Sequence, residues 1–154
     1  MEKGAIISDC KKFRYRLWRV WDETKPQILF VMLNPSTADE NNDDPTIRRC
    51  INFAKSWGYG GMFVGNLFAY RTAYPKELKE AGFLIGNDNE SHLKEMKGFC
   101  DKVVCAWGNQ FEVPSRITDV FDDLYCIELS KTGIPKHPLY LKKELKPQQL
   151  ELKK

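Results

Sequence analysis

Apolar residues along the chain gather in short runs separated by polar stretches, a pattern typical of strands that alternate with helices. Four runs are almost continuously apolar, which predicts strands covered on both faces: residues 28–33, 62–69, 102–107 and 124–129. A fifth segment, residues 13–21, alternates more loosely between apolar and polar positions and predicts an edge or hairpin strand.

Helical spacing of apolar residues fills the stretches between these runs. The predicted helices are residues 45–57, a short helix begun by Pro75, a helix capped at residues 87–89 that runs through Met96, and residues 113–121. The pattern therefore predicts a single α/β domain over residues 1–154. We expect a three-layer sandwich with a largely parallel central sheet, followed by a charged tail at residues 142–154.

The predicted strands run into conspicuous polar or aromatic groups instead of ordinary turns. In chain order these groups are Asn34-Pro35-Ser36, Asn66 followed by Tyr70-Arg71, Trp107-Gly108, and His137-Pro138 in the loop after the fourth run. In parallel α/β sheets the ligand crevice lies beyond the carboxyl ends of the strands. We therefore expect the four groups to meet at one edge of the sheet.

Composition adds only a few constraints. The chain has 154 residues, 42% of them apolar, as in a packed domain. A net charge of +3 permits nucleic-acid binding without requiring it, and the basic residues within 11–19, 48–49 and 142–154 are expected to be solvated surface. No apolar run approaches the roughly 20 residues of a membrane helix, and the N-terminus lacks the apolar core of a signal peptide. We expect a cytoplasmic protein without a membrane partner; the oligomeric state stays open.

Cysteine and histidine are too few and too scattered to predict a metal site. The five cysteines contain no CxxC pair, and the chain has only two histidines. We therefore expect thiols that are buried or idle, and neither a metal ion nor an organic cofactor.

Six motifs spread over almost the whole chain connect it to a known family. They are LNPSTAD, the DDPT that opens the following helix, GNLFAYR, GNDN, VVCAWG and KHPLYL. Through them the sequence resembles the family catalogued as domain of unknown function 1643, a resemblance that by itself implies no activity.

The order of the strand-end motifs is also similar, more distantly, to the uracil-DNA glycosylase-like superfamily. There a Gly-x-Asn-Pro-Gly-type motif, a base-reading Asn, a Trp-Gly pair and a His-Pro-Ser loop follow one another. Their counterparts here are residues 32–36, Asn66, Trp107-Gly108 and residues 137–139. Met32, Ser36 and Leu139 replace the two glycines and the serine, so side chains stand where a substrate would approach closely.

This resemblance implies a uracil-DNA glycosylase-like fold and the hydrolysis of an N-glycosidic bond. Asn34 would orient a water towards the sugar carbon. His137 would donate a hydrogen bond from a neutral imidazole to the departing base, and Asn66 would read the polar edge of that base.

The remaining candidates would bind the substrate. Pro35, Ser36 and Trp107 belong to the matching motifs, and Arg71 is placed to meet a phosphate. Tyr70, with Phe68 and Trp57, could stack on a base, and Tyr140 is the candidate wedge for base extrusion. The candidate residues also have ordinary structural alternatives: Asn34 can form the bend beside Pro35, and Trp107 can fill the end of the sheet. The second histidine, His92, is expected on the surface.

Two other functions stay open on the sequence alone. The same crevice could bind a nucleotide or a nucleic-acid end without turnover. Alternatively, Asp39, Asp43 or Asp44 could serve as the base of a small-molecule hydrolase, although acidic residues before a helix also complement its dipole.

Overall fold

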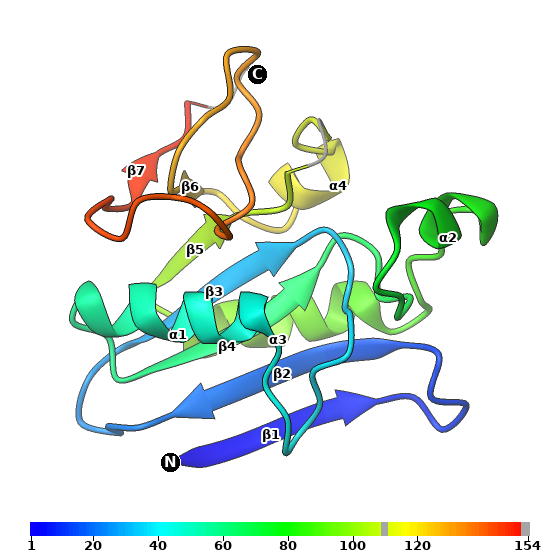
Figure 1. Cartoon of the computed structure of the whole chain (residues 1–154), viewed down its shortest axis with the longest axis horizontal. Helices are drawn as coiled ribbons and strands as arrows, with labels where there is room; N and C mark the ends of the chain where they lie inside the picture. Colours follow the sequence, from blue (N-terminus) through cyan, green and yellow to red (C-terminus); the bar gives the residue numbers. More distant parts are fainter. Residues whose placement is uncertain (109–110, 152–154) are drawn as a thin grey trace.

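The computed structural model describes residues 1–108 and 111–151, which fold around one mixed sheet (Figure 1). The strand order is β1-β2-β4-β3-β5-β6-β7. The strands are β1 (Glu2–Ile7), β2 (Arg14–Val20), β3 (Gln27–Met32), β4 (Gly61–Asn66), β5 (Lys102–Cys105), β6 (Tyr125–Cys126) and β7 (Gln148–Gln149). The helices are α1 (Pro45–Ser56), α2 (Pro75–Glu80), α3 (Asn89–Phe99) and α4 (Ser115–Thr118).

The sheet is less parallel than the sequence pattern predicts. Strands β4, β3, β5 and β6 run parallel, but β2 pairs antiparallel with β4, β1 pairs antiparallel with β2, and β7 pairs antiparallel with β6. The prediction of a largely parallel sheet is therefore wrong, and the sheet is mixed. The difference comes from the two margins, where an N-terminal hairpin and a returning C-terminal segment extend a parallel centre.

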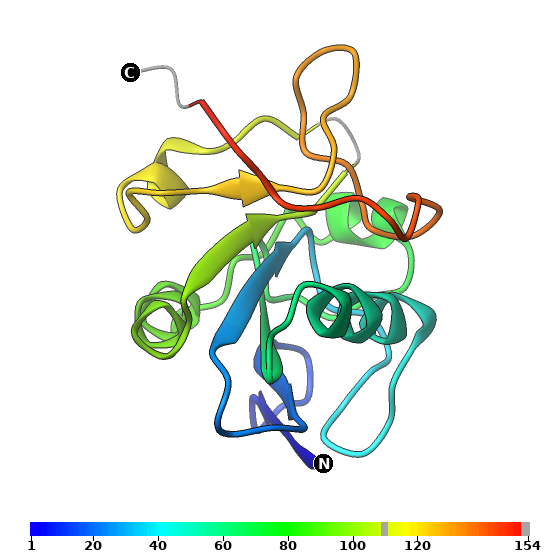
Figure 2. The same ribbon diagram turned by 90° about the vertical axis from the view of Figure 1, so that its left-hand side faces the viewer.

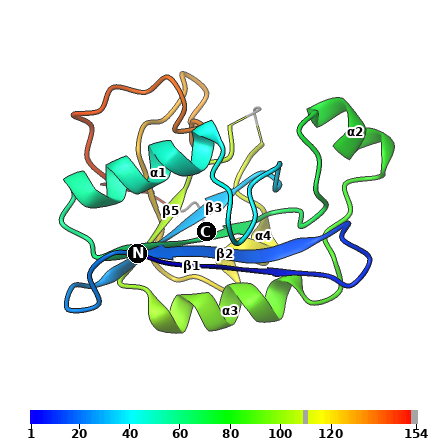
Figure 3. The ribbon, with the colours of Figure 1, turned by 60° about the horizontal axis from the view of Figure 1, so that its bottom comes forward.

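Helices cover the two faces of the sheet, α1 on one and α3 on the other (Figures 2 and 3). The side chains of β3 alternate between these two layers. Phe30 packs in the core beneath α1, whereas Leu29 and Val31 pack in the core that includes residues of α3. Because both faces are covered, every second position does not have to be polar, and β3 is apolar from Ile28 to Met32.

Some of the predicted elements are shorter in the structure. Only residues 115–118 are helical where 113–121 were predicted, and β6 is a two-residue strand where 124–129 were predicted. Ile117, Leu124 and Ile127 are all buried. The apolar pattern here marks burial of irregular backbone, which periodicity alone cannot distinguish from regular structure.

Part of the C-terminal segment packs on the domain. Residues 148–149 form edge strand β7, and Leu145 packs against the core beneath α1. The indole Nε1 of Trp57 donates a hydrogen bond to the carbonyl of Leu145 (2.9 Å). The segment predicted as a charged tail thus includes an edge strand; residues 152–154 lie outside the described part of the chain.

Within residues 1–108 and 111–151, no helix is both long enough and apolar enough to span a bilayer.

Candidate functional site

A cavity of about 270 Å³ lies beyond the carboxyl ends of the parallel strands β3, β4 and β5. It is lined by Arg14, Met32, Leu33, Asn34, Ser36, Asp44, Thr46, Ile47, Val64, Asn66, Thr72, Ala73, Pro75, Trp107, His137 and Leu139. Five of the predicted catalytic and substrate-binding residues are thus brought together: Asn34, Ser36, Asn66, Trp107 and His137. Met32 and Leu139 form part of its wall and do not fill it.

Asn34 follows β3 and fastens two loops to each other. Its Nδ2 donates hydrogen bonds to the carbonyls of Thr72 (2.9 Å) and Pro35 (3.1 Å), with a longer one to Tyr70 (3.4 Å). The amide nitrogen is therefore committed to the backbone. The oxygen Oδ1 accepts no hydrogen bond from the residues the structure describes, so it is the atom that can serve a ligand or a water.

Asn66, the last residue of β4, is completely buried. Its backbone carbonyl accepts a hydrogen bond from Nδ2 of Asn89 (2.9 Å). Its own Nδ2 and Oδ1 find no partner within residues 1–108 and 111–151. Buried polar groups are almost always hydrogen-bonded, so an unpaired amide beside a cavity is a strong sign of a ligand-binding position.

His137 reaches the cavity from the irregular loop after β6. Its Nδ1 accepts a hydrogen bond from the backbone N–H of Leu139 (3.2 Å), which places the proton of the neutral ring on Nε2. Burial lowers the pKa of His137, and the carboxylate of Asp44 opposes this in part. At neutral pH the ring is therefore an uncharged donor.

The backbone joins the His137 loop to the end of β5. Gly108 donates its N–H to the carbonyl of Pro135 (3.0 Å) and has a φ of +65°. A Cβ at Gly108 would lie only 3.1 Å from the Cβ of His137. Trp107, next to it, is fully buried and donates from Nε1 to the carbonyl of Phe111 (2.7 Å), so it closes the end of the sheet as well as lining the cavity.

One charged residue of the cavity, Arg14, was not expected there. Arg14 is 2% exposed, although the basic residues of this segment were predicted to be solvated. Its Nη1 donates to the carbonyl of Ala38 (3.0 Å). Burial lowers the pKa of Arg14 to about 10, so the guanidinium remains charged at neutral pH.

The acidic residues of the first loop have three different roles. Asp39 accepts bonds from the backbone N–H groups of Asn41 and Asn42, which lower its pKa, and Asp43 pairs with Arg19 (2.8 Å). Asp44 caps α1 by accepting from the N–H of Ile47 (2.8 Å) and also lines the cavity. Of the three, it is the one positioned near the candidate site.

Three predicted substrate-binding residues, Pro35, Tyr70 and Arg71, do not line the cavity. Pro35 and Tyr70 contribute backbone carbonyls that hold Asn34. Arg71 donates from Nη1 to the carbonyl of Lys11 (3.3 Å), while its Nε is buried without a partner in the described chain.

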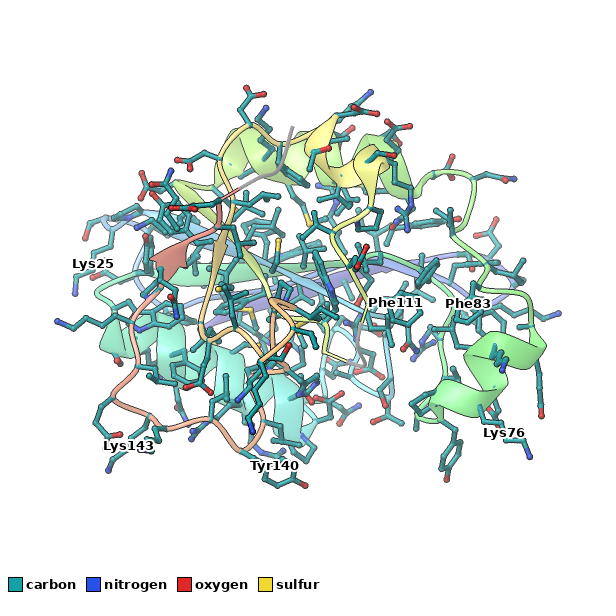
Figure 4. The ribbon with its side chains drawn as sticks, turned by 90° about the horizontal axis from the view of Figure 1, so that it is seen from above. Lys25, Lys76, Phe83, Phe111, Tyr140 and Lys143 are labelled. Carbon is teal, nitrogen blue, oxygen red and sulfur yellow. The ribbon has the colours of Figure 1, made fainter. Side chains whose placement is uncertain are left out.

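The other predicted stacking residues also pack elsewhere. Phe68 contacts Phe83 and Phe111, which lie side by side in Figure 4, and Trp57 packs on Phe53. Tyr140, which directly follows the cavity residue Leu139, projects outward and is 94% exposed (Figure 4).

The second histidine, His92, is partly exposed on α3 and contacts residues of β2. The ring of His92 stacks on Tyr15 with centroids 5.0 Å apart, and its Nδ1 accepts a bond from Nε of Arg16 (2.9 Å). The ring thus accepts a hydrogen bond from the buried guanidinium of Arg16, and His92 does not line the cavity.

Comparison with known proteins assigns the chain to a family. A family model described as a protein of unknown function (DUF1643) matches residues 14–139. The chain therefore belongs to that family, and the matched range holds every cavity residue named above. The curated proteins and the solved structures with which the chain was compared provide no match.

Proposed function

We propose that this protein is a glycosylase-like hydrolase that cleaves the N-glycosidic bond of a nucleobase, in DNA or in a modified nucleotide. One observation carries the proposal: Asn34, Asn66 and His137, from three separate parts of the chain, line the same cavity. Its volume of about 270 Å³ is near the lower limit of ordinary ligand pockets, about 300–1,000 Å³, and suits a compact flat heterocycle.

Asn34 would position the attacking water. Because Nδ2 is held by backbone carbonyls, Oδ1 is fixed and can accept a hydrogen bond from water. An amide cannot act as a general base, so the reaction is dissociative. The C–N bond breaks first, its electron pair leaves with the base, and water adds to the sugar cation. The water's proton then passes to Asp44 or to solvent.

His137 and Asn66 would hold the departing base. A neutral imidazole donating from Nε2 stabilises negative charge on the base, and one such donor is worth roughly 3 kcal/mol, or about 100-fold in rate. The amide of Asn66 offers both a donor and an acceptor, the combination that the polar edge of a pyrimidine requires.

A second candidate is a nucleotide- or nucleic-acid-binding module without turnover. It is favoured by the three hydrogen bonds of the Asn34 Nδ2, which account for this residue as a loop fastener without any catalytic role.

The test is a screen of the purified protein against oligonucleotides and nucleotides carrying uracil, hydroxymethylated and glycosylated pyrimidines, scored for base release. We expect His137→Ala to lower the rate about 100-fold, whereas His92→Ala, the matched control, retains it. Asn34→Asp keeps an acceptor oxygen at the water position but loses the Nδ2 donor that fastens the loops. It therefore separates the positioning of water from the support of the loops. Base release from no substrate, with binding retained, would leave the binding module as the function.

A further inference from the structure

Three arginines of β2 are buried, and Arg14 differs from the other two. Arg19 donates five hydrogen bonds, one of them to Asp43. Arg16 pairs with His92 and Glu95. In the described chain Arg14 makes one side-chain hydrogen bond, to the carbonyl of Ala38, and its buried Nε has no partner.

The charge of Arg14 has no close counter-ion in the described part of the protein. No carboxylate oxygen there lies within 4.0 Å of its guanidinium, and Asp44 attracts it only from farther away. Arg71 is near enough to repel it. A charge taken out of water without a paired partner is strongly unfavourable, so a fold that keeps one beside a cavity calls for an outside anion.

We propose that the cavity takes an anionic ligand, that the guanidinium of Arg14 pairs with its negative group, and that Asn66 reads a heterocycle edge beside it. Both residues line the same cavity and both keep unpaired polar atoms in the described chain. This names the ligand class of the site proposed above. Because the test is binding, the inference can be judged apart from turnover.

Guanidinium groups recognise carboxylate and phosphate through paired hydrogen bonds, so the anion can be either one. A phosphate belongs to a nucleotide, and a carboxylate would stand on the heterocycle itself. Calorimetric titrations with thymidine 5′-monophosphate against thymidine, and with uracil-6-carboxylate against uracil, distinguish these sources. Inorganic phosphate serves as the bare-anion probe.

We expect one anionic probe to bind about 10- to 100-fold more tightly than its uncharged partner, the range of a hydrogen bond to a charged group. Arg14→Met should abolish that preference and Arg14→Lys should restore part of it. Arg71→Met, a nearby arginine outside the cavity lining, should keep it. Circular dichroism of each variant verifies folding.

Equal affinity for charged and uncharged partners, an unchanged preference in Arg14→Met, or no binding of any probe would overturn the inference. Anion binding that depends on Arg14, without base release from any substrate, would leave the inference standing and remove the proposed hydrolysis. Base release that Arg14→Met leaves unaffected would support the proposed hydrolysis and overturn the inference about Arg14.

Discussion

The two ends of strand β2 bury the same side chain in opposite circumstances. Near one end, Arg19 is saturated by Asp43 and by backbone carbonyls that include those of Asp39 and Asn42. At the other, Arg14 lines a cavity with most of its donors unused within the described chain. The first guanidinium fastens the loop before α1 to the sheet. The second has no comparable structural role in the described chain, as expected of the anion-binding residue proposed above.

Replacing each of these two arginines should have its most different effect on the stability of the fold. Arg19→Met leaves Asp43 and several carbonyls unpaired, so we expect the free energy of unfolding to fall by about 3–5 kcal/mol. Arg14→Met removes one hydrogen bond together with an unpaired buried charge, so we expect it not to lower that free energy. Urea unfolding followed by tryptophan fluorescence measures both. Equal losses would erase the distinction.

A second comparison uses two fully buried asparagines, Asn66 and Asn89. Asn66→Leu replaces an unpaired amide, and we expect unfolding to become harder by about 1–3 kcal/mol while ligand affinity is lost. Asn89→Leu removes the bond from Nδ2 to the Asn66 carbonyl and should lower stability by about 1 kcal/mol. The same unfolding assay applies, and a destabilised Asn66→Leu would show that this amide is structurally satisfied.

Two glycines with positive φ test how closely the His137 loop must approach β5. Gly108→Ala and Gly133→Ala both place a side chain in the left-handed region and should each cost about 1–2 kcal/mol. Only at Gly108 would the new Cβ meet His137; at Gly133 nothing lies within 4 Å. Ligand affinity should therefore fall in Gly108→Ala alone, as measured by calorimetry at matched protein concentration.

The smallest expected effect on stability is at Tyr140. Since the ring is 94% exposed, Tyr140→Ala should leave the unfolding free energy within about 0.5 kcal/mol. For a DNA substrate, oligonucleotide affinity should fall by about 1–3 kcal/mol through lost stacking, while free-nucleotide affinity is kept. Fluorescence anisotropy with labelled oligonucleotides provides the measurement, and parallel losses for both ligands would place the ring at the cavity itself.

The parts of the fold that could be predicted are those whose local pattern matches their burial. Strand β3 is apolar from Ile28 onward because both of its faces are covered, and α1 begins at a proline after an aspartate cap. Strands β1 and β7 were missed because exposed margins need no apolar pattern, and β7 consists of two exposed glutamines. Their pairing depends on long-range geometry.

The candidate site divides in the same way. Asn34, Asn66 and His137 could be found because polar residues at the ends of buried runs are conspicuous in the sequence. Arg14 could not, since a charge in an alternating strand is ordinarily solvated, and its burial follows from the loop that brings Ala38 against it. The local sequence around Arg71 also gives no sign that this residue lies outside the cavity lining.

The bond from the Gly108 N–H to the Pro135 carbonyl has a practical consequence for protein engineers. This bond joins main-chain atoms, so it does not depend on which side chains stand at 139 and 140. Leu139 and Tyr140 could therefore be randomised together in a library without detaching that segment. Variants with altered ligand preference would then keep the imidazole of His137 in its position.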